Sequence, residues 1–67
     1  MEKKIRSVKE IREGLGMVQE DFAKLVGVRV KTISVWERTN TFPISPNTMR
    51  VLEELDAKVD KLEAENG

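Results

Sequence analysis

The sequence predicts a small all-α bundle of four to five helices, the last of them extended. Three observations support this fold class. Helix-forming residues dominate the 67-residue chain, whereas aromatic residues make up only 4% of it. Apolar residues recur at helical spacing along residues 19–38, where Gly27 separates two short segments. From Pro46 onward no helix breaker occurs until Gly67, which predicts one long helix or two helices with a soft joint.

The composition excludes several classes of protein. A chain of 67 residues can form one domain with a small core. No segment approaches the ~18 consecutive apolar residues of a transmembrane helix, and no signal peptide is apparent. With no cysteine, the chain has neither disulfides nor thiolate chemistry. We therefore expect a cytoplasmic protein.

The net charge is zero, but the charges are segregated along the chain. Residues 1–50 hold ten Lys or Arg against six Asp or Glu, whereas residues 51–67 hold two against six. A modestly basic part is therefore followed by an acidic tail. A basic excess is typical of nucleic-acid binding, and we expect the tail to point away from bound phosphates.

The first helix is predicted to begin at Val8, because Ser7 and Glu10 form the S-x-x-E pattern of a capping box. Gly14 and Gly16 mark its end. The basic lead-in over residues 1–6 is either a frayed terminus or an arm that touches phosphate.

Two further helices are predicted over residues 19–26 and 30–39, joined by a turn at Gly27. Neither Val18 nor Arg29 offers the side-chain oxygen of a good N-cap. A helical wheel of residues 30–39 separates an apolar side from a polar and basic outer side. Such a helix is short enough to enter a DNA major groove, so the stretch predicts a helix-turn-helix.

These residues resemble those of the Cro/C1-type helix-turn-helix family of phage repressors and bacterial regulators, also called the Xre family. The matching positions are Gln19, Glu20, Asp21, Ala23, Gly27, Val28, Thr32, Ile33, Glu37 and Arg38. The resemblance covers roughly residues 5–55 and implies a lambda-repressor-like bundle. The chain departs from the family pattern at Val18, Arg29 and Thr39, where the family usually has two Ser or Thr caps and a glycine.

The resemblance also implies roles for single residues. It pairs Arg12 with Glu37 as a clamp between the first and third helices, although two solvated charges remain an alternative. Gln19 would bridge a DNA phosphate or support a side chain of the third helix. Thr32 would meet phosphate, and Asn40, which tolerates a left-handed backbone, would close the third helix near the sugar-phosphate backbone.

The remaining DNA contacts are expected from side-chain chemistry. Lys31 and Ser34 can serve a base or the backbone, and Arg38 is the strongest phosphate candidate. Arg29 is either a DNA contact or a solvated cation, and the valines can contact thymine methyl groups or pack at the edge of the core. Together the candidate DNA-binding residues are Gln19, Arg29, Val30, Lys31, Thr32, Ser34, Val35, Arg38 and Asn40.

The last helix carries a short heptad pattern. Its members, three and four residues apart in alternation, are Leu52, Leu55, Val59, Leu62 and Asn66. We expect Leu55, Val59 and Leu62 to form a dimer contact; alternatively, the helix only completes its own domain and frays after Asp60. The predicted organisation is a DNA-binding domain over residues 1–55 and an acidic helical extension over 56–67.

An enzyme is not expected, because the chain has no histidine and no cysteine and its carboxylates are scattered. We expect no catalytic residue, metal or cofactor. The leading hypothesis is a homodimeric, sequence-specific double-stranded DNA-binding transcription regulator, most simply a repressor. The alternative is an antitoxin or another protein-interaction module that uses the acidic C-terminal helix to bind a protein partner.

Overall fold

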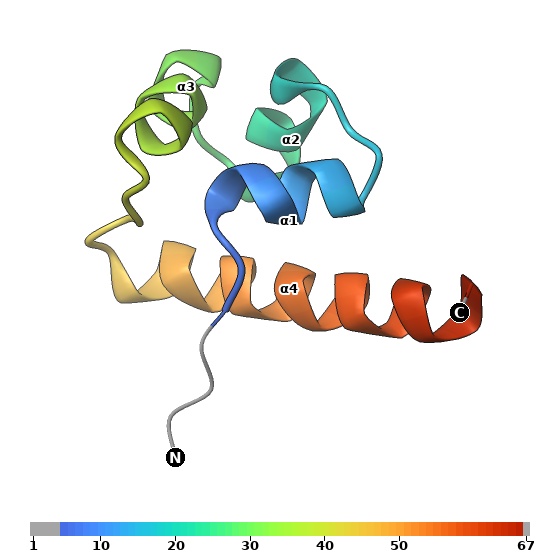
Figure 1. Cartoon of the computed structure of the whole chain (residues 1–67). Coiled ribbons are helices and arrows are strands. Elements are labelled where there is room, and N and C mark those ends of the chain that lie inside the picture. The colour runs from blue at the N-terminus through green and yellow to red at the C-terminus, as the bar shows by residue number, and fades with distance from the viewer. Residues whose placement is uncertain (1–4, 67) are drawn as a thin grey trace.

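The computed structural model describes residues 5–66 and contains four α-helices in that range. They are α1 (Val8–Gly14), α2 (Gln19–Val26), α3 (Val30–Thr39) and α4 (Pro46–Asn66). In Figure 1, α2 and α3 lie on one side of α1, and α4 runs along its other side. The predicted all-α class and the single long last helix are confirmed.

Local sequence signals explain where α1 begins. The hydroxyl of Ser7 accepts a hydrogen bond from the Glu10 amide at 3.2 Å, and the Glu10 carboxylate accepts one from the Ser7 amide at 3.0 Å. This is the predicted capping box, which satisfies two amides that the first helical turn leaves unpaired. By contrast, α2 and α3 begin after Val18 and Arg29 with no side-chain cap within the described chain.

Two left-handed residues end the middle helices. Gly27, with φ 88°, donates its amide to the Ala23 carbonyl at 2.8 Å and turns the chain from α2 toward α3. Asn40, with φ 54°, donates its amide to the Trp36 carbonyl and closes α3. The predicted substitution of asparagine for the usual glycine cap is therefore confirmed, since asparagine tolerates this backbone region.

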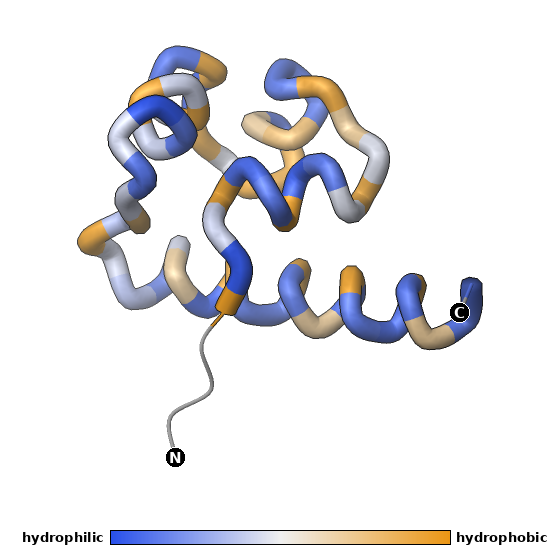
Figure 2. The backbone as a smooth tube through the Cα atoms, in the orientation of Figure 1, coloured by the Kyte–Doolittle hydropathy of each residue, from blue (hydrophilic) through white to orange (hydrophobic). Residues whose placement is uncertain are grey.

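The core draws on all four helices. Its buried members are Val8, Ile11, Phe22, Ala23, Val26, Ile33, Leu52 and Val59. Figure 2 shows hydrophobic positions recurring along α4 among hydrophilic ones, as expected for a helix with one packed side. Because burying one large aliphatic or aromatic side chain stabilises a fold by about 1.5–3 kcal/mol, this shared core holds α4 against the three shorter helices.

Val59 corrects the predicted dimer contact. Its side chain is 0% exposed, so it packs inside its own domain and is not available to a partner. The neighbour that accommodates it is Gly14, where an added Cβ would lie 2.6 Å from Val59 Cγ1. Leu55 packs partly against the same core, and Leu62 is half-buried. Dimerisation through these two leucines and a domain boundary after residue 55 stay predictions.

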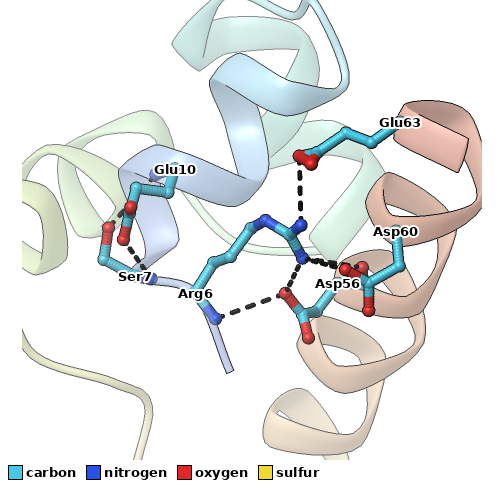
Figure 3. Close-up of polar contacts among 6 residues, drawn as sticks. All are labelled: Arg6, Ser7, Glu10, Asp56, Asp60 and Glu63. Atoms are coloured by element: carbon cyan, nitrogen blue, oxygen red, sulfur yellow. Dashed lines mark hydrogen bonds and ion pairs between the residues drawn. The ribbon is translucent and has the colours of Figure 1, made fainter. Parts of the chain in front are cut away.

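A second packing feature joins the chain ends (Figure 3). The Arg6 guanidinium lies 2.9 Å from Asp56, 2.7 Å from Asp60 and 3.0 Å from Glu63. The Arg6 amide also donates to the Asp56 carboxylate at 3.2 Å. The Asp56 side chain is only 2% exposed, so its charge depends on Arg6 for compensation. We call these four residues the Arg6 clasp.

The clasp tests the two interpretations of residues 1–6, a frayed terminus or an arm that touches phosphate. Ion pairs with Asp56, Asp60 and Glu63 hold Arg6 against α4, and the hydrogen bonds to Asp56 and Asp60 raise the pKa of Arg6 further above its ordinary value. Arg6 is therefore neither frayed nor available as part of a phosphate-binding arm. Lys3 and Lys4, the other cations of that expected arm, lie outside the described residues.

Substituting Gly14 tests the contact between α1 and α4. Gly14→Ala gains helix propensity but drives a methyl group into the stiff, buried Val59, an overpacking that typically costs about 1–3 kcal/mol. We expect a lower free energy of unfolding in urea titrations. The double variant Gly14→Ala/Val59→Ala should lose less than the sum of the two single variants. A stabilised Gly14→Ala protein would contradict the close approach.

Substituting Arg6 tests the clasp. Arg6→Ala leaves the buried Asp56 carboxylate without its cation, so we expect a lower melting temperature by circular dichroism. Replacing Asp56 by alanine as well should recover part of that loss. Arg50→Ala, which removes an exposed arginine of α4, is the matched control and should have little effect. Equal melting temperatures for Arg6→Ala and Arg50→Ala would show that the clasp contributes nothing.

Candidate nucleic-acid interface

The candidate residues lie on α3, at its two ends and at the start of α2, and all of them are at least partly exposed. Those that are exposed are Arg29, Val30, Lys31, Arg38 and Asn40; those that are half-buried are Gln19, Thr32, Ser34 and Val35. The opposite side of α3 carries Ile33, which is 0% exposed in the core. The helix therefore offers polar and cationic groups outward while it is anchored by an apolar residue. Contact of these residues with DNA stays a prediction.

An ion pair fixes the inner side of α3 to α1. The Arg12 Nε donates to one Glu37 carboxylate oxygen at 2.7 Å, and Arg12 Nη2 donates to the other at 3.1 Å. Both side chains are largely buried, with 16% of Arg12 and 8% of Glu37 exposed. Paired hydrogen bonds of this kind fix orientation as well as distance. The predicted ion pair is confirmed.

Gln19 completes the same cluster from the first residue of α2. Its side-chain amide donates to Glu37 at 3.1 Å, while Arg12 Nη1 donates to the Met17 carbonyl at 2.9 Å. The structure thus shows Gln19 in the second of its two expected roles, supporting a side chain of α3. We call Arg12, Gln19 and Glu37 the Glu37 cluster, because Glu37 accepts from both of the others.

The cluster also sets the charge of Glu37. Burial raises the pKa of this carboxyl, but hydrogen bonds from Arg12 and Gln19 and the positive charge of Arg12 outweigh it and leave the pKa below its ordinary value. Glu37 is therefore an anion matched by Arg12. The cations Arg29, Lys31 and Arg38 consequently have no unmatched carboxylate of α3 beside them.

The chain beyond α3 is ordered by threonine hydroxyls. Thr39 donates to the Val35 carbonyl at 2.7 Å, and its oxygen lies 2.8 Å from that of Thr41. Asn40 and Thr41, both exposed, are thereby held at the C-terminal end of α3. A short polar segment therefore follows directly after α3.

Sequence comparison assigns this architecture. A sequence model of the helix-turn-helix family, of the Cro/C1 type, matches residues 8–59. The chain belongs to the Cro/C1-type helix-turn-helix family. It is a DNA-binding helix-turn-helix domain of a family made up generally of transcription regulators. Searches of curated proteins and of solved structures found no significant match.

In this helix-turn-helix domain, α2 and α3 form the motif, joined by the turn at Gly27. The family match ends at residue 59, so it includes the buried Asp56 and Val59 of α4. Among residues 5–66, no helix is long and apolar enough to cross a membrane, and no group of three or more candidate side chains could hold a metal ion.

One cluster escaped the sequence analysis. The carboxylates of the Arg6 clasp belong to residues 56, 60 and 63, a spacing of four and then three that places them on one side of a helix. That spacing indicates a group of carboxylates that can bind one cation. The sequence analysis treats these residues only as part of an acidic tail, because no neighbouring residue indicates which distant cation they would bind.

Protonating Glu37 should weaken the domain. A carboxyl whose folded-state pKa is depressed contributes stability above its unfolded value of about 4.3, and loses it as the pH falls through the folded-state value. We expect Glu37→Gln to lower the free energy of unfolding at pH 7 by roughly 1–3 kcal/mol, as for other hydrogen bonds to charged groups.

That difference should shrink as the pH falls below about 4.3, and urea titrations over a pH series measure it. Glu10 also has a lowered pKa, first through its hydrogen bond with the Ser7 backbone. Because both proteins retain Glu10, its effect cancels in the comparison. A difference that stayed constant down to pH 2 would show that the Glu37 charge is not what stabilises the cluster.

Proposed function

We propose that this protein is a sequence-specific regulator of transcription that inserts α3 into the major groove of double-stranded DNA and acts as a repressor. The observation that carries the proposal is the exposed cationic side of α3, held in orientation by the Glu37 cluster. Repression is the simplest output, since a bound domain excludes other proteins from the same DNA.

The chemistry of α3 supports both phosphate and base contacts. Lys31, in the first turn, can donate to the guanine O6 and N7 atoms or to phosphate, and Arg38 at the other end can donate to phosphate. Ser34 lies between them, one turn before Arg38, and can hydrogen-bond to either partner. Val30 and Val35 can contact thymine methyl groups.

Phosphate contacts are also available from the backbone. The amides in the first turns of α2 and α3 receive no side-chain cap from Val18 or Arg29. Helix N-termini bind anions through such amides, aided by the helix dipole. The N-termini of α2 and α3 are therefore both suited to hydrogen-bonding DNA phosphates on either side of the major groove.

Discrimination between sequences should rest on few contacts. The outer side of α3 has neither Gln nor Asn, the residues that read adenine with two hydrogen bonds. Sequence-dependent DNA shape then contributes a larger share of specificity. As a homodimer, the protein would bind two half-sites about 34 Å apart, one helical turn of DNA.

The alternative function, in which the acidic helix α4 binds a protein partner, has less support than DNA binding by α3. Three of the α4 carboxylates, on Asp56, Asp60 and Glu63, are engaged by Arg6 within the same chain. In Figure 1, α4 begins near the end of α3, and its C-terminal part, which carries these carboxylates, runs away from α3. This position suits a helix that keeps its negative charge away from bound DNA. It suits less well a helix whose carboxylates compete with DNA for the cations of α3.

The proposal is tested by the salt dependence of DNA binding. Lys31→Ala and Arg38→Ala should each weaken binding and reduce the slope of log affinity against log salt by about one if the cation contacts phosphate. If Lys31 reads a base, its loss should instead relax preference at one position of a selected duplex. Fluorescence anisotropy at several salt concentrations measures both effects.

The matched control is Lys61→Ala, which removes an exposed lysine from α4. It should leave affinity and slope unchanged. Equal losses for Lys31→Ala and Lys61→Ala would point to non-specific attraction by net charge. No binding by the native protein at low salt would overturn the proposal.

A further inference from the structure

Two threonine hydroxyls at the end of α3 form a chain of hydrogen bonds that runs in a single direction. A hydroxyl carries one proton, and Thr39 donates its proton to the Val35 carbonyl at 2.7 Å, because a carbonyl can only accept. The 2.8 Å contact between the oxygens of Thr39 and Thr41 therefore has Thr41 as its donor. We call this chain, from Thr41 through Thr39 to the Val35 carbonyl, the threonine relay.

The relay spans a residue whose backbone is costly for most side chains. Asn40, between the two threonines, has φ 54°, in the left-handed region. Its amide and that of Thr41 both donate to the Trp36 carbonyl, the latter at 3.0 Å. These backbone bonds close α3. The relay therefore adds a side-chain tie on either side of Asn40 to the backbone bonds that already hold it.

The relay also decides which groups at this end of α3 can bind an anion. The C-terminal end of a helix carries partial negative charge, which repels a phosphate. Both threonine protons are used within the relay, so the two hydroxyls present only lone pairs outward. Among residues 38–41, the side-chain donors that remain are the guanidinium of Arg38 and the carboxamide of Asn40. Both residues are exposed, and the Asn40 carboxamide makes no hydrogen bond to the rest of residues 5–66.

We propose that the threonine relay is a positioning device, in which Thr39 and Thr41 hold Asn40 so that its carboxamide donates to a DNA phosphate. The proposal rests on the proposed function, since it requires α3 to lie in the major groove. In an inserted helix of this kind the N-terminal residues contact base edges. The C-terminal end of α3 is then left to the sugar-phosphate backbone, where Arg38 and Asn40 are the available donors.

The benefit of the relay is that Asn40 is ordered before DNA arrives. Fixing a loop residue on binding costs conformational entropy, which lowers affinity. In this chain the hydrogen bonds of Thr39 and Thr41 fix it in the free protein. Because phosphate contacts set orientation without reading sequence, the relay should affect DNA affinity and leave base preference unchanged.

Asn40→Gly separates the cap from the DNA contact. Glycine favours the left-handed backbone, so the melting temperature should not fall, whereas the carboxamide is lost. Affinity for the duplex selected by the native protein should fall roughly three- to tenfold, as expected for the loss of one hydrogen bond. Because the carboxamide is uncharged, the slope of log affinity against log salt should not change, unlike the slope for Arg38→Ala. Fluorescence anisotropy measures both quantities.

Thr39→Val tests the relay itself, because valine resembles threonine in shape but has no hydroxyl. Without DNA, the amides of Asn40 and Thr41 should exchange faster with deuterium than in the native protein. DNA affinity should fall by no more than in Asn40→Gly, and Thr39→Ser, which keeps a hydroxyl, should restore affinity and exchange. When residue 40 is already glycine, Thr39→Val should cause no further loss. The matched control is Thr48→Val, which removes a threonine hydroxyl from α4 and should change neither measurement.

The outcomes separate the two proposals. Native affinity in Thr39→Val, equal losses in Thr39→Val and Thr39→Ser, or a further loss from Thr39→Val beside Asn40→Gly would each overturn the positioning role. In all three cases salt-dependent binding by the native protein would leave the proposed function standing. A native protein that binds no duplex at low salt would overturn the proposed function and the phosphate contact together. Faster amide exchange in Thr39→Val would in that case still show that the relay orders Asn40.

Discussion

The orientation of α3 depends on the Glu37 cluster. Apolar packing through Ile33 holds the helix near the core, but dispersion contacts have little directional preference. The paired hydrogen bonds from Arg12 and the third from Gln19 are directional, and they reach Glu37 from α1 and from the start of α2. A largely buried ion pair is a weak source of net stability because of its desolvation cost. Its contribution here is to determine which side of α3 faces outward.

Ion pairing inside the domain also explains how a chain of zero net charge can present a cationic surface. Arg12 matches Glu37 on the inner side of α3, and Arg6 gathers three carboxylates on α4. The segregation seen along the sequence is therefore partly reversed in space, because a basic N-terminal residue lies against the acidic helix. What remains outward on α3 is positive. Net charge alone is thus a poor guide to the field that a phosphate would meet.

Much of the fold was predictable because its signals are local. The capping box at Ser7, the left-handed turn at Gly27 and the cap at Asn40 each depend on a few neighbouring residues, and all three were predicted. The role of Val59 was not, because spacings of three and four describe an internal core and a dimer seam equally well. The Arg6 clasp was missed for a related reason. It joins residues that are 50 to 57 positions apart in the chain, and the spacing of the carboxylates does not indicate which distant cation they bind. For the interface, the sequence predicted which side of α3 is polar. It did not predict the apolar groove lined by Val35, Trp36 and the segment 41–45, because that groove exists only once the segment folds beside Trp36.

The polar outer side of α3 and the apolar groove meet on one helix, so a substitution in α3 can change both surfaces at once. The polar side of α3 offers Lys31, Ser34 and Arg38, while the adjoining edge offers Val35 and Trp36 to the groove. Val35 lies at the boundary, so a change there alters the apolar wall of the groove and the outer side of α3 together. Trp36 has its side chain partly in the core and its carbonyl in the cap that ends α3. The direction in which both surfaces face depends on the rotation of α3 about its own axis, which the hydrogen bonds to Glu37 fix.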